Sequence, residues 1–83
     1  MSHTPHELAD AFPQDRDLIH RLKLEDAHFA RLAEEYHAVN RTVHRIESEV
    51  EPASDERAEG MKKQRLALAD ELAAILAKAR AAA

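Results

Sequence analysis

Apolar side chains recur at spacings of three and four residues along most of the chain. Over residues 14–51 they form one seam that only Glu25 interrupts. The seam consists of Leu18, Leu22, Phe29, Leu32, Tyr36, Val39, Val43, Ile46 and Val50. This spacing puts the residues on one helix face and is typical of helices packed side by side in a coiled coil. We predict a helix over residues 14–51, roughly 55 Å long.

A second helix is predicted over residues 54–80. Pro52 ends the first helix, because proline cannot continue it. Ser54 is placed to cap the second helix, and Asp55 and Glu56 bring negative charge to the positive end of its dipole. Its apolar seam consists of Ala58, Met61, Leu68, Leu72, Ile75 and Ala79, with Arg65 as the polar break. Gly60 lies inside this helix, at a cost of up to about 1 kcal/mol relative to alanine.

The short connection makes the two helices antiparallel neighbours. One register satisfies both seams: it pairs Val43 with Met61, Tyr36 with Leu68, Leu32 with Leu72, and Phe29 with Ile75. The predicted fold is therefore all-α, a two-helix antiparallel coiled-coil hairpin over residues 14–83. Residues 1–13 are predicted to be a mobile tail, which Phe12 and Pro13 separate from the first helix.

Two apolar surfaces have no partner inside such a hairpin. The start of the first helix overhangs the alanine-rich end of the second, and the second helix carries an additional apolar stripe. The residues concerned are Leu18, Ile19, Leu22 and Leu24 in the overhang, and Leu66, Ala69, Ala73 and Leu76 in the stripe. Exposed apolar patches usually mark interfaces. We predict a protein interface here, formed either by self-association into a helical bundle or with a larger protein partner.

The composition lacks the residue types on which several catalytic and binding sites depend. Among 83 residues there is one glycine and no cysteine, so thiolate chemistry, disulfides and glycine-rich phosphate loops are excluded. His37 with Glu34, and His44 with Glu47, have helical spacing, yet each pair falls short of the ligands of a metal site. We predict a protein that is not an enzyme and has no cofactor, metal or small-molecule substrate. A pH- or metal-responsive histidine protein stays open as a third alternative.

The charge distribution argues against nucleic acid as the main partner. The formal net charge is −4 with neutral histidines, whereas phosphate binding depends on many lysines and arginines. Lys62, Lys63 and Arg65 form the one basic cluster; a solvated helix face is the favoured interpretation, and an RNA contact is the alternative. No apolar run is long enough for a membrane span, and no secretory signal pattern opens the chain. We expect a cytoplasmic protein.

Several short motifs resemble the YdcH family of small bacterial proteins. They are Asp17-Leu18-Ile19-x-x-Leu22-Lys23, Asp26-x-His28-Phe29-x-Arg31-Leu32-x-x-Glu35-Tyr36, Lys62-Lys63-Gln64-Arg65-Leu66 and Asp70-Glu71-Leu72-x-x-Ile75-Leu76. The resemblance covers roughly residues 6–78. It implies a helical hairpin and a bacterial cytoplasmic protein, and it supplies no activity, because the family is one of unknown function. It also draws attention to Asp26, His28 and Arg31, which heptad packing does not require.

Two interpretations of Asp26, His28 and Arg31 stay open, a contact with a partner and a local structural role. For the chain as a whole we predict a non-enzymatic protein–protein interaction module that dimerises or docks on a larger assembly. A small RNA-associated regulator is the alternative.

Overall fold

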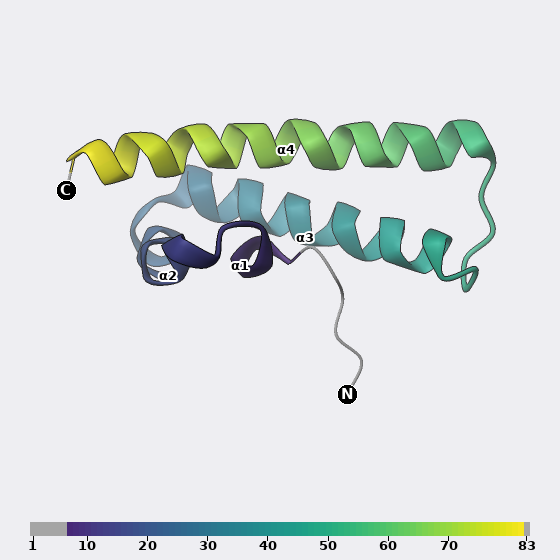
Figure 1. Ribbon diagram of the computed structural model, residues 1–83, viewed down its shortest axis with the longest axis horizontal. Coiled ribbons are helices and arrows are strands. Elements are labelled where there is room, and N and C mark those ends of the chain that lie inside the picture. The colour runs from purple at the N-terminus through teal and green to yellow at the C-terminus, as the bar shows by residue number, and fades with distance from the viewer. Residues whose placement is uncertain (1–6, 83) are drawn as a thin grey trace.

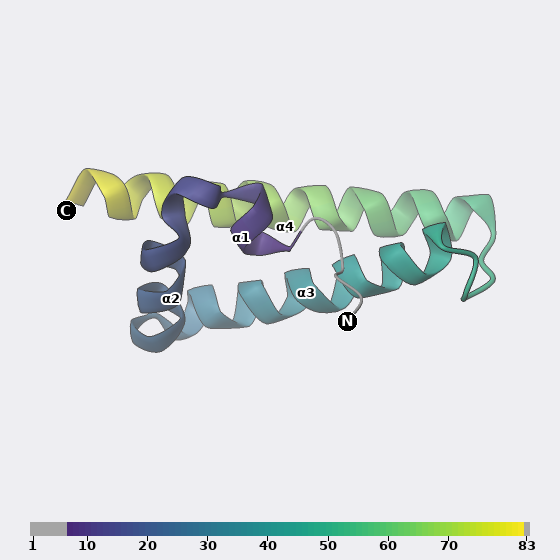
Figure 2. The same cartoon turned by 60° about the horizontal axis from the view of Figure 1, so that its bottom comes forward.

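The computed structural model describes residues 7–82, and every regular element within them is a helix. The two longest, α3 (Ala27–Glu47) and α4 (Asp55–Ala82), lie side by side and antiparallel (Figures 1 and 2). The predicted all-α class is confirmed. The chain is nevertheless divided into more helices than the two that the sequence predicted, because three short elements precede α3.

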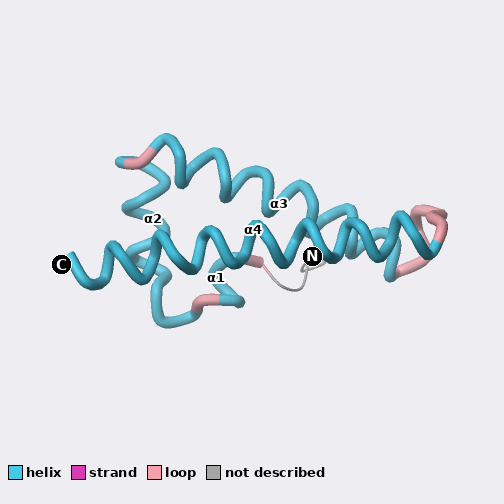
Figure 3. The backbone as a smooth tube through the Cα atoms, turned by 90° about the horizontal axis from the view of Figure 1, so that it is seen from above, coloured by secondary structure: helices cyan, strands magenta, loops and turns pink. Residues whose placement is uncertain are grey.

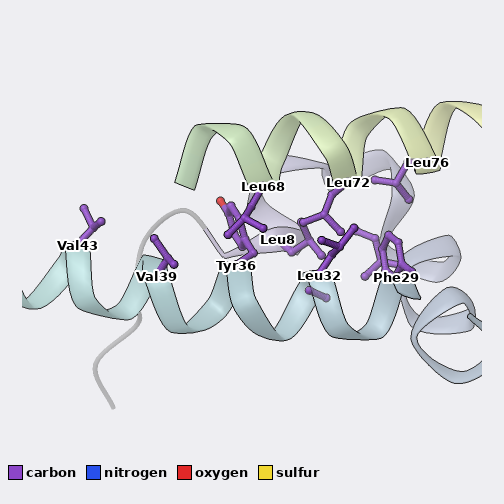
Figure 4. Close-up of a cluster of buried hydrophobic side chains, with 11 residues drawn as sticks. Leu8, Phe29, Leu32, Tyr36, Val39, Val43, Leu68, Leu72 and Leu76 are labelled. Carbon is purple, nitrogen blue, oxygen red and sulfur yellow. The ribbon is translucent and has the colours of Figure 1, made fainter. Parts of the chain in front are cut away.

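Much of the two predicted seams lies in the core, but Val50 is 73% exposed, Ile75 is half-buried, and Leu76 of the additional stripe is fully buried. Figure 4 draws Leu68 beside Tyr36 and Leu72 above Leu32, which is the expected register. The buried residues of the two helices are Phe29, Leu32, Ala33, Tyr36, Val39 and Val43 from α3, and Leu68, Leu72 and Leu76 from α4. Arg65, the polar break in the α4 seam, donates a hydrogen bond of 3.1 Å to the buried Asn40. The break is therefore a polar link between the two helices.

The helix predicted over residues 14–51 is divided at Asp26. Asp26 is extended (φ −124°, ψ 103°) and separates α2 (Arg16–Glu25) from α3. Its N–H donates to the Leu22 carbonyl at 2.8 Å, which closes α2, and its carboxylate accepts the Phe29 N–H at 3.1 Å, which caps α3. An aspartate at this position is among the best helix N-caps. The polar gap in the seam is thus a corner of the chain, and Figure 2 shows α2 turning from α3 toward α4.

The tail predicted to be mobile over residues 1–13 supplies part of the core. Residues 1–6 lie outside the described residues, but α1 (Leu8–Ala11) and the 3₁₀ helix η1 (Pro13–Asp15) are ordered elements. Leu8 is only 1% exposed, and Phe12 packs against the same cluster. Seen from above, α3 and α1 lie on opposite sides of α4, and α2 passes beneath it (Figure 3). Figure 4 draws Leu8 between the side chains of α3 and α4, so the returning segment completes the core of the hairpin.

We refer to residues 7–25, which contain α1, η1 and α2, as the N-terminal cover. Two polar contacts hold it to the long helices, a carboxylate–imidazole contact and an ion pair. Near its start, Glu7 lies 2.6 Å from the imidazole Nδ1 of His37 on α3. Farther along, the mostly buried carboxylate of Asp15 accepts a 2.5 Å hydrogen bond from Arg80 near the end of α4. The cover is therefore fixed both by apolar contacts and by charge.

The connection between α3 and α4 begins with a backbone-capped helix end. The Val50 N–H donates to the Arg45 carbonyl at 3.0 Å, and the Glu49 N–H donates to the Ile46 carbonyl at 3.1 Å. These are the two bonds of a Schellman motif, and the residue between helix and connection must then be left-handed. Glu49 fills that position with φ 62°. Glycine is the usual residue there, so this helix end carries backbone strain.

A carboxylate and a cap complete the connection. Glu51 lies between two guanidinium groups, 3.2 Å from Arg45 and 2.8 Å from Arg57. The hydrogen bond from Arg57, followed by that from Arg45, lowers the pKa of Glu51. Ser54 accepts the Arg57 N–H at 3.1 Å and so caps α4, as its place in the sequence predicted.

Replacing Leu8 by alanine tests whether the cover belongs to the core. We expect Leu8→Ala to lower the free energy of unfolding by about 2–5 kcal/mol, because it leaves a cavity at a fully buried site. Chemical denaturation monitored by circular dichroism measures the change. Leu24→Ala is the matched control, since Leu24 is 76% exposed. An equal effect of the two substitutions would show that the cover does not pack as described.

Replacing Glu49 by glycine should stabilise the protein. The substitution removes the cost of a left-handed glutamate, and after the greater flexibility of glycine in the unfolded chain is subtracted we expect a gain of about 0.5–1 kcal/mol. The same substitution at Glu35, an exposed residue inside α3, should instead destabilise by about 1 kcal/mol. Thermal unfolding of both variants measures the two changes in stability. A loss of stability in Glu49→Gly would contradict the left-handed backbone conformation of Glu49.

Candidate interaction surface

The structure divides the interface that the sequence predicted. Ile19 (4% exposed) and Leu76 (0%) belong to the core, and Leu18, Leu22, Ala69 and Ala73 are half-buried. Only Leu24 (76%) and Leu66 (63%) are exposed. The prediction of one interface from all eight residues is therefore corrected. It assumed that α2 continues the line of α3, whereas the corner at Asp26 turns α2 and its leucines back onto the hairpin.

Leu66 remains as the centre of an outward face of α4. Residues at helical spacing from it share this face: Lys62 and Lys63 before it, and Asp70 and Ala73 after it. Ala69, which has the same spacing, packs against the core instead. We call these five residues, with Leu66 included, the Leu66 face. The lysines and the aspartate lie on opposite sides of the leucine along the helix. The face is thus suited to a helix that carries the reverse order of charge.

The basic cluster offered as the alternative RNA contact lies partly along α3. The Lys62 ammonium lies 3.9 Å from the Glu47 carboxylate, and both side chains remain largely exposed, while Arg65 donates to Asn40. Lys63 is exposed. Arg65 therefore has a structural role, and the RNA alternative stays a prediction.

The three motif residues at the start of α3 have different surroundings. Asp26 is the N-cap, which is a local structural role. His28 and Arg31 are exposed on the first two turns of α3. A sequence signal for the cap was present, since aspartate three residues before an apolar helical position is typical of an N-terminus.

Among residues 7–82, no three histidine, cysteine, aspartate or glutamate side chains are grouped as a metal site would require. Nor does any described helix combine the length and the apolar character needed to cross a membrane.

The pKa of Tyr36, a buried residue of the core, is shifted by its surroundings. Burial raises its pKa above the ordinary value of 10.0, and Arg65 partly offsets this by favouring the phenolate, while Glu7 and Asp10 add to the increase. Because a protonated phenol suits the folded state better, its contribution to stability is present below pH 10 and is lost as the pH rises through the raised pKa.

Alkaline titration tests the surroundings of Tyr36. The chain has one tyrosine, so phenolate absorbance near 295 nm reports that residue alone. We expect its transition at a higher pH in the folded protein than in the urea-unfolded chain, together with loss of helicity over the same pH range. Tyr36→Phe should remove that link between pH and helicity. Coincident titration of folded and unfolded chains would contradict the burial of the hydroxyl.

Comparison with known proteins identifies one family. A family model described as "Protein of unknown function (DUF465)" matches residues 29–76, which run from the first turn of α3 to Leu76 in α4. The matched part excludes the N-terminal cover. Neither the curated proteins nor the solved structures give a match to the chain.

Proposed function

The chain belongs to the DUF465 family, which includes the YdcH proteins that its motifs resemble, and we propose that it is a non-enzymatic protein–protein interaction module. The family supplies no activity, so the proposal rests on the surface of the molecule. Its central observation is that Leu66, a large apolar residue, is 63% exposed near the middle of the long, straight helix α4. We place the protein in the cytoplasm, in keeping with the resemblance.

A second copy of the chain is the partner that fits the Leu66 face. In an antiparallel pair of α4 helices centred on Leu66, the residue four positions before the leucine faces the residue four positions after it. Lys62 of each copy then faces Asp70 of the other, and the two leucines meet at the centre. Such a two-fold arrangement uses the same patch on both subunits, as most dimer interfaces do. The two hairpins together form a helical bundle.

The energetic weight of this interface comes from the leucines. Burying one leucine side chain is worth about 1.5–3 kcal/mol, whereas an exposed ion pair contributes about 0–1 kcal/mol. Ala73 is small and allows the helices to approach. Lys62 and Asp70 therefore set the antiparallel direction, and Leu66 supplies the affinity.

Leu66→Glu tests the proposal. We expect the substitution to weaken the dimer of the wild-type chain at least about a hundredfold, because it replaces two buried leucines by two carboxylates, a loss of more than about 3 kcal/mol. Helicity and the denaturation midpoint of the monomer should stay nearly unchanged, since Leu66 makes no core contact. Light scattering over a concentration series measures the mass. Leu24→Glu, at an equally exposed leucine outside the face, is the control and should leave the dimer intact.

The result also separates the alternatives. Association as tight in Leu66→Glu as in the wild-type chain would refute the Leu66 face as the interface. An RNA regulator would instead bind an RNA oligonucleotide with an affinity that falls steeply with salt and disappears when Lys62, Lys63 and Arg65 are all replaced by alanine.

A further inference from the structure

The residue spacing around the bend at Asp26 is compatible with a second backbone state. The three-four spacing passes through the bend without a change of phase, since Leu18, Leu22, the polar Glu25 and Phe29 follow one another at spacings of four, three and four. That pattern is typical of one continuous helix. The same stretch contains the aspartate that caps α3. Local signals that favour two different structures are expected where two packings of one sequence lie close in free energy.

We call the alternative the straight state, in which one helix continues through Asp26 and joins α2 to α3. Backbone hydrogen bonds alone favour it. Each helix end leaves up to four N–H or C=O groups without an intrahelical partner. At the bend, the Asp26 side chain and N–H satisfy one group of α3 and one of α2. A helix that continued through Asp26 would satisfy the others with ordinary backbone hydrogen bonds.

The N-terminal cover is what holds the bend. It brings the buried Leu8 and Ile19 against the core of α3 and α4, and its two polar contacts join Glu7 to His37 and Asp15 to Arg80. In a straight chain the cover would swing away and uncover Phe29 and Leu76. Its own leucines would then face only the alanine-rich end of α4. A straight monomer therefore exposes apolar surface on both the cover and the hairpin.

We propose that two copies of this chain exchange their N-terminal covers, with Asp26 helical and each cover packed on the hairpin of the other copy. A second copy fits the uncovered face because its cover brings the same apolar side chains and the same acidic partners for His37 and Arg80. α1 has only four residues and is too short to be a helix without such a surface. The cover makes the same contacts in the monomer and in the exchanged dimer. The backbone state of the hinge at Asp26 and the chain concentration therefore decide the equilibrium between monomer and dimer.

This exchange goes beyond the proposed function, because it uses the covered side of α4 and not the Leu66 face. The two are kept apart by making every variant in a chain that carries Leu66→Glu. Dimers that remain in this background cannot come from pairing of the Leu66 faces.

Two neighbouring substitutions move the hinge in opposite directions. Asp26→Ala removes the cap and adds a strong helix former, so it favours the straight state. Ala27→Pro locks the bend: proline is well accepted at the first position of a helix, and it forces the residue before it to be extended, as Asp26 already is. Ser54→Ala is the control, because it removes the equivalent N-cap of α4 without touching the hinge.

Native mass spectrometry and light scattering over a concentration series measure the dimer. We expect Asp26→Ala to tighten dimerisation at least tenfold, since loss of a cap changes the equilibrium about fivefold at each of two hinges. Ala27→Pro should be monomeric at every concentration, and Ser54→Ala should dimerise like the parent. A dimer that is indifferent to both hinge variants, or no dimer even in Asp26→Ala, would overturn the exchange.

A charge-reversal pair shows directly whether the covers cross. Chains with Asp15→Arg and chains with Arg80→Asp each have like charges at the far end of the cover. Mixing them should produce a heterodimer in which both pairs are again of opposite charge, with a melting temperature above that of either chain alone. If the mixture melts as two independent species, the covers do not exchange.

Discussion

The hydrogen bond from the Phe29 N–H to the Asp26 carboxylate fixes the corner on which the rest of the fold depends. Because α2 turns there, the segment before it returns along the hairpin and adds Leu8 and Ile19 to the core. Without the corner, α2 would continue past the end of the hairpin with its leucines facing alanines. The corner therefore allows Leu8 and Ile19 to be buried.

The two polar breaks in the apolar seams have separate structural roles. The break at Glu25 and Asp26 marks a helix boundary, whereas Arg65 reaches across to the buried Asn40. A buried polar residue is costly unless it is hydrogen-bonded, so this bond ties α3 and α4 together at one register. Polar contacts at Asp15 and at Glu7 do the same for the cover. Apolar packing supplies the stability, and these polar contacts select the arrangement.

The sequence predicted α3 and α4 and their pairing because both carry long, regular seams. The sequence analysis predicted one continuous helix where the corner at Asp26 lies, although an aspartate three residues before a buried phenylalanine is a recognisable N-cap. The role of Leu8 was beyond prediction, since a few apolar residues between prolines have no periodicity to measure. The pairs Glu7–His37 and Asp15–Arg80 join positions far apart in the chain, and only the tertiary structure brings them together.

The position of the cover also explains which residues of the predicted interface are exposed in the structure. Leu66 and Leu24 point outward, as expected, but Ile19 and Leu76 are buried because the cover folds back and both join the core cluster. That partner lies outside the family match, which begins at Phe29. Residues 29–76 alone contain Leu72 and Leu76 but neither Leu8 nor Ile19, so they have the hairpin without its cover. The surface that this chain presents is therefore determined by the segment preceding the family domain as much as by the domain itself.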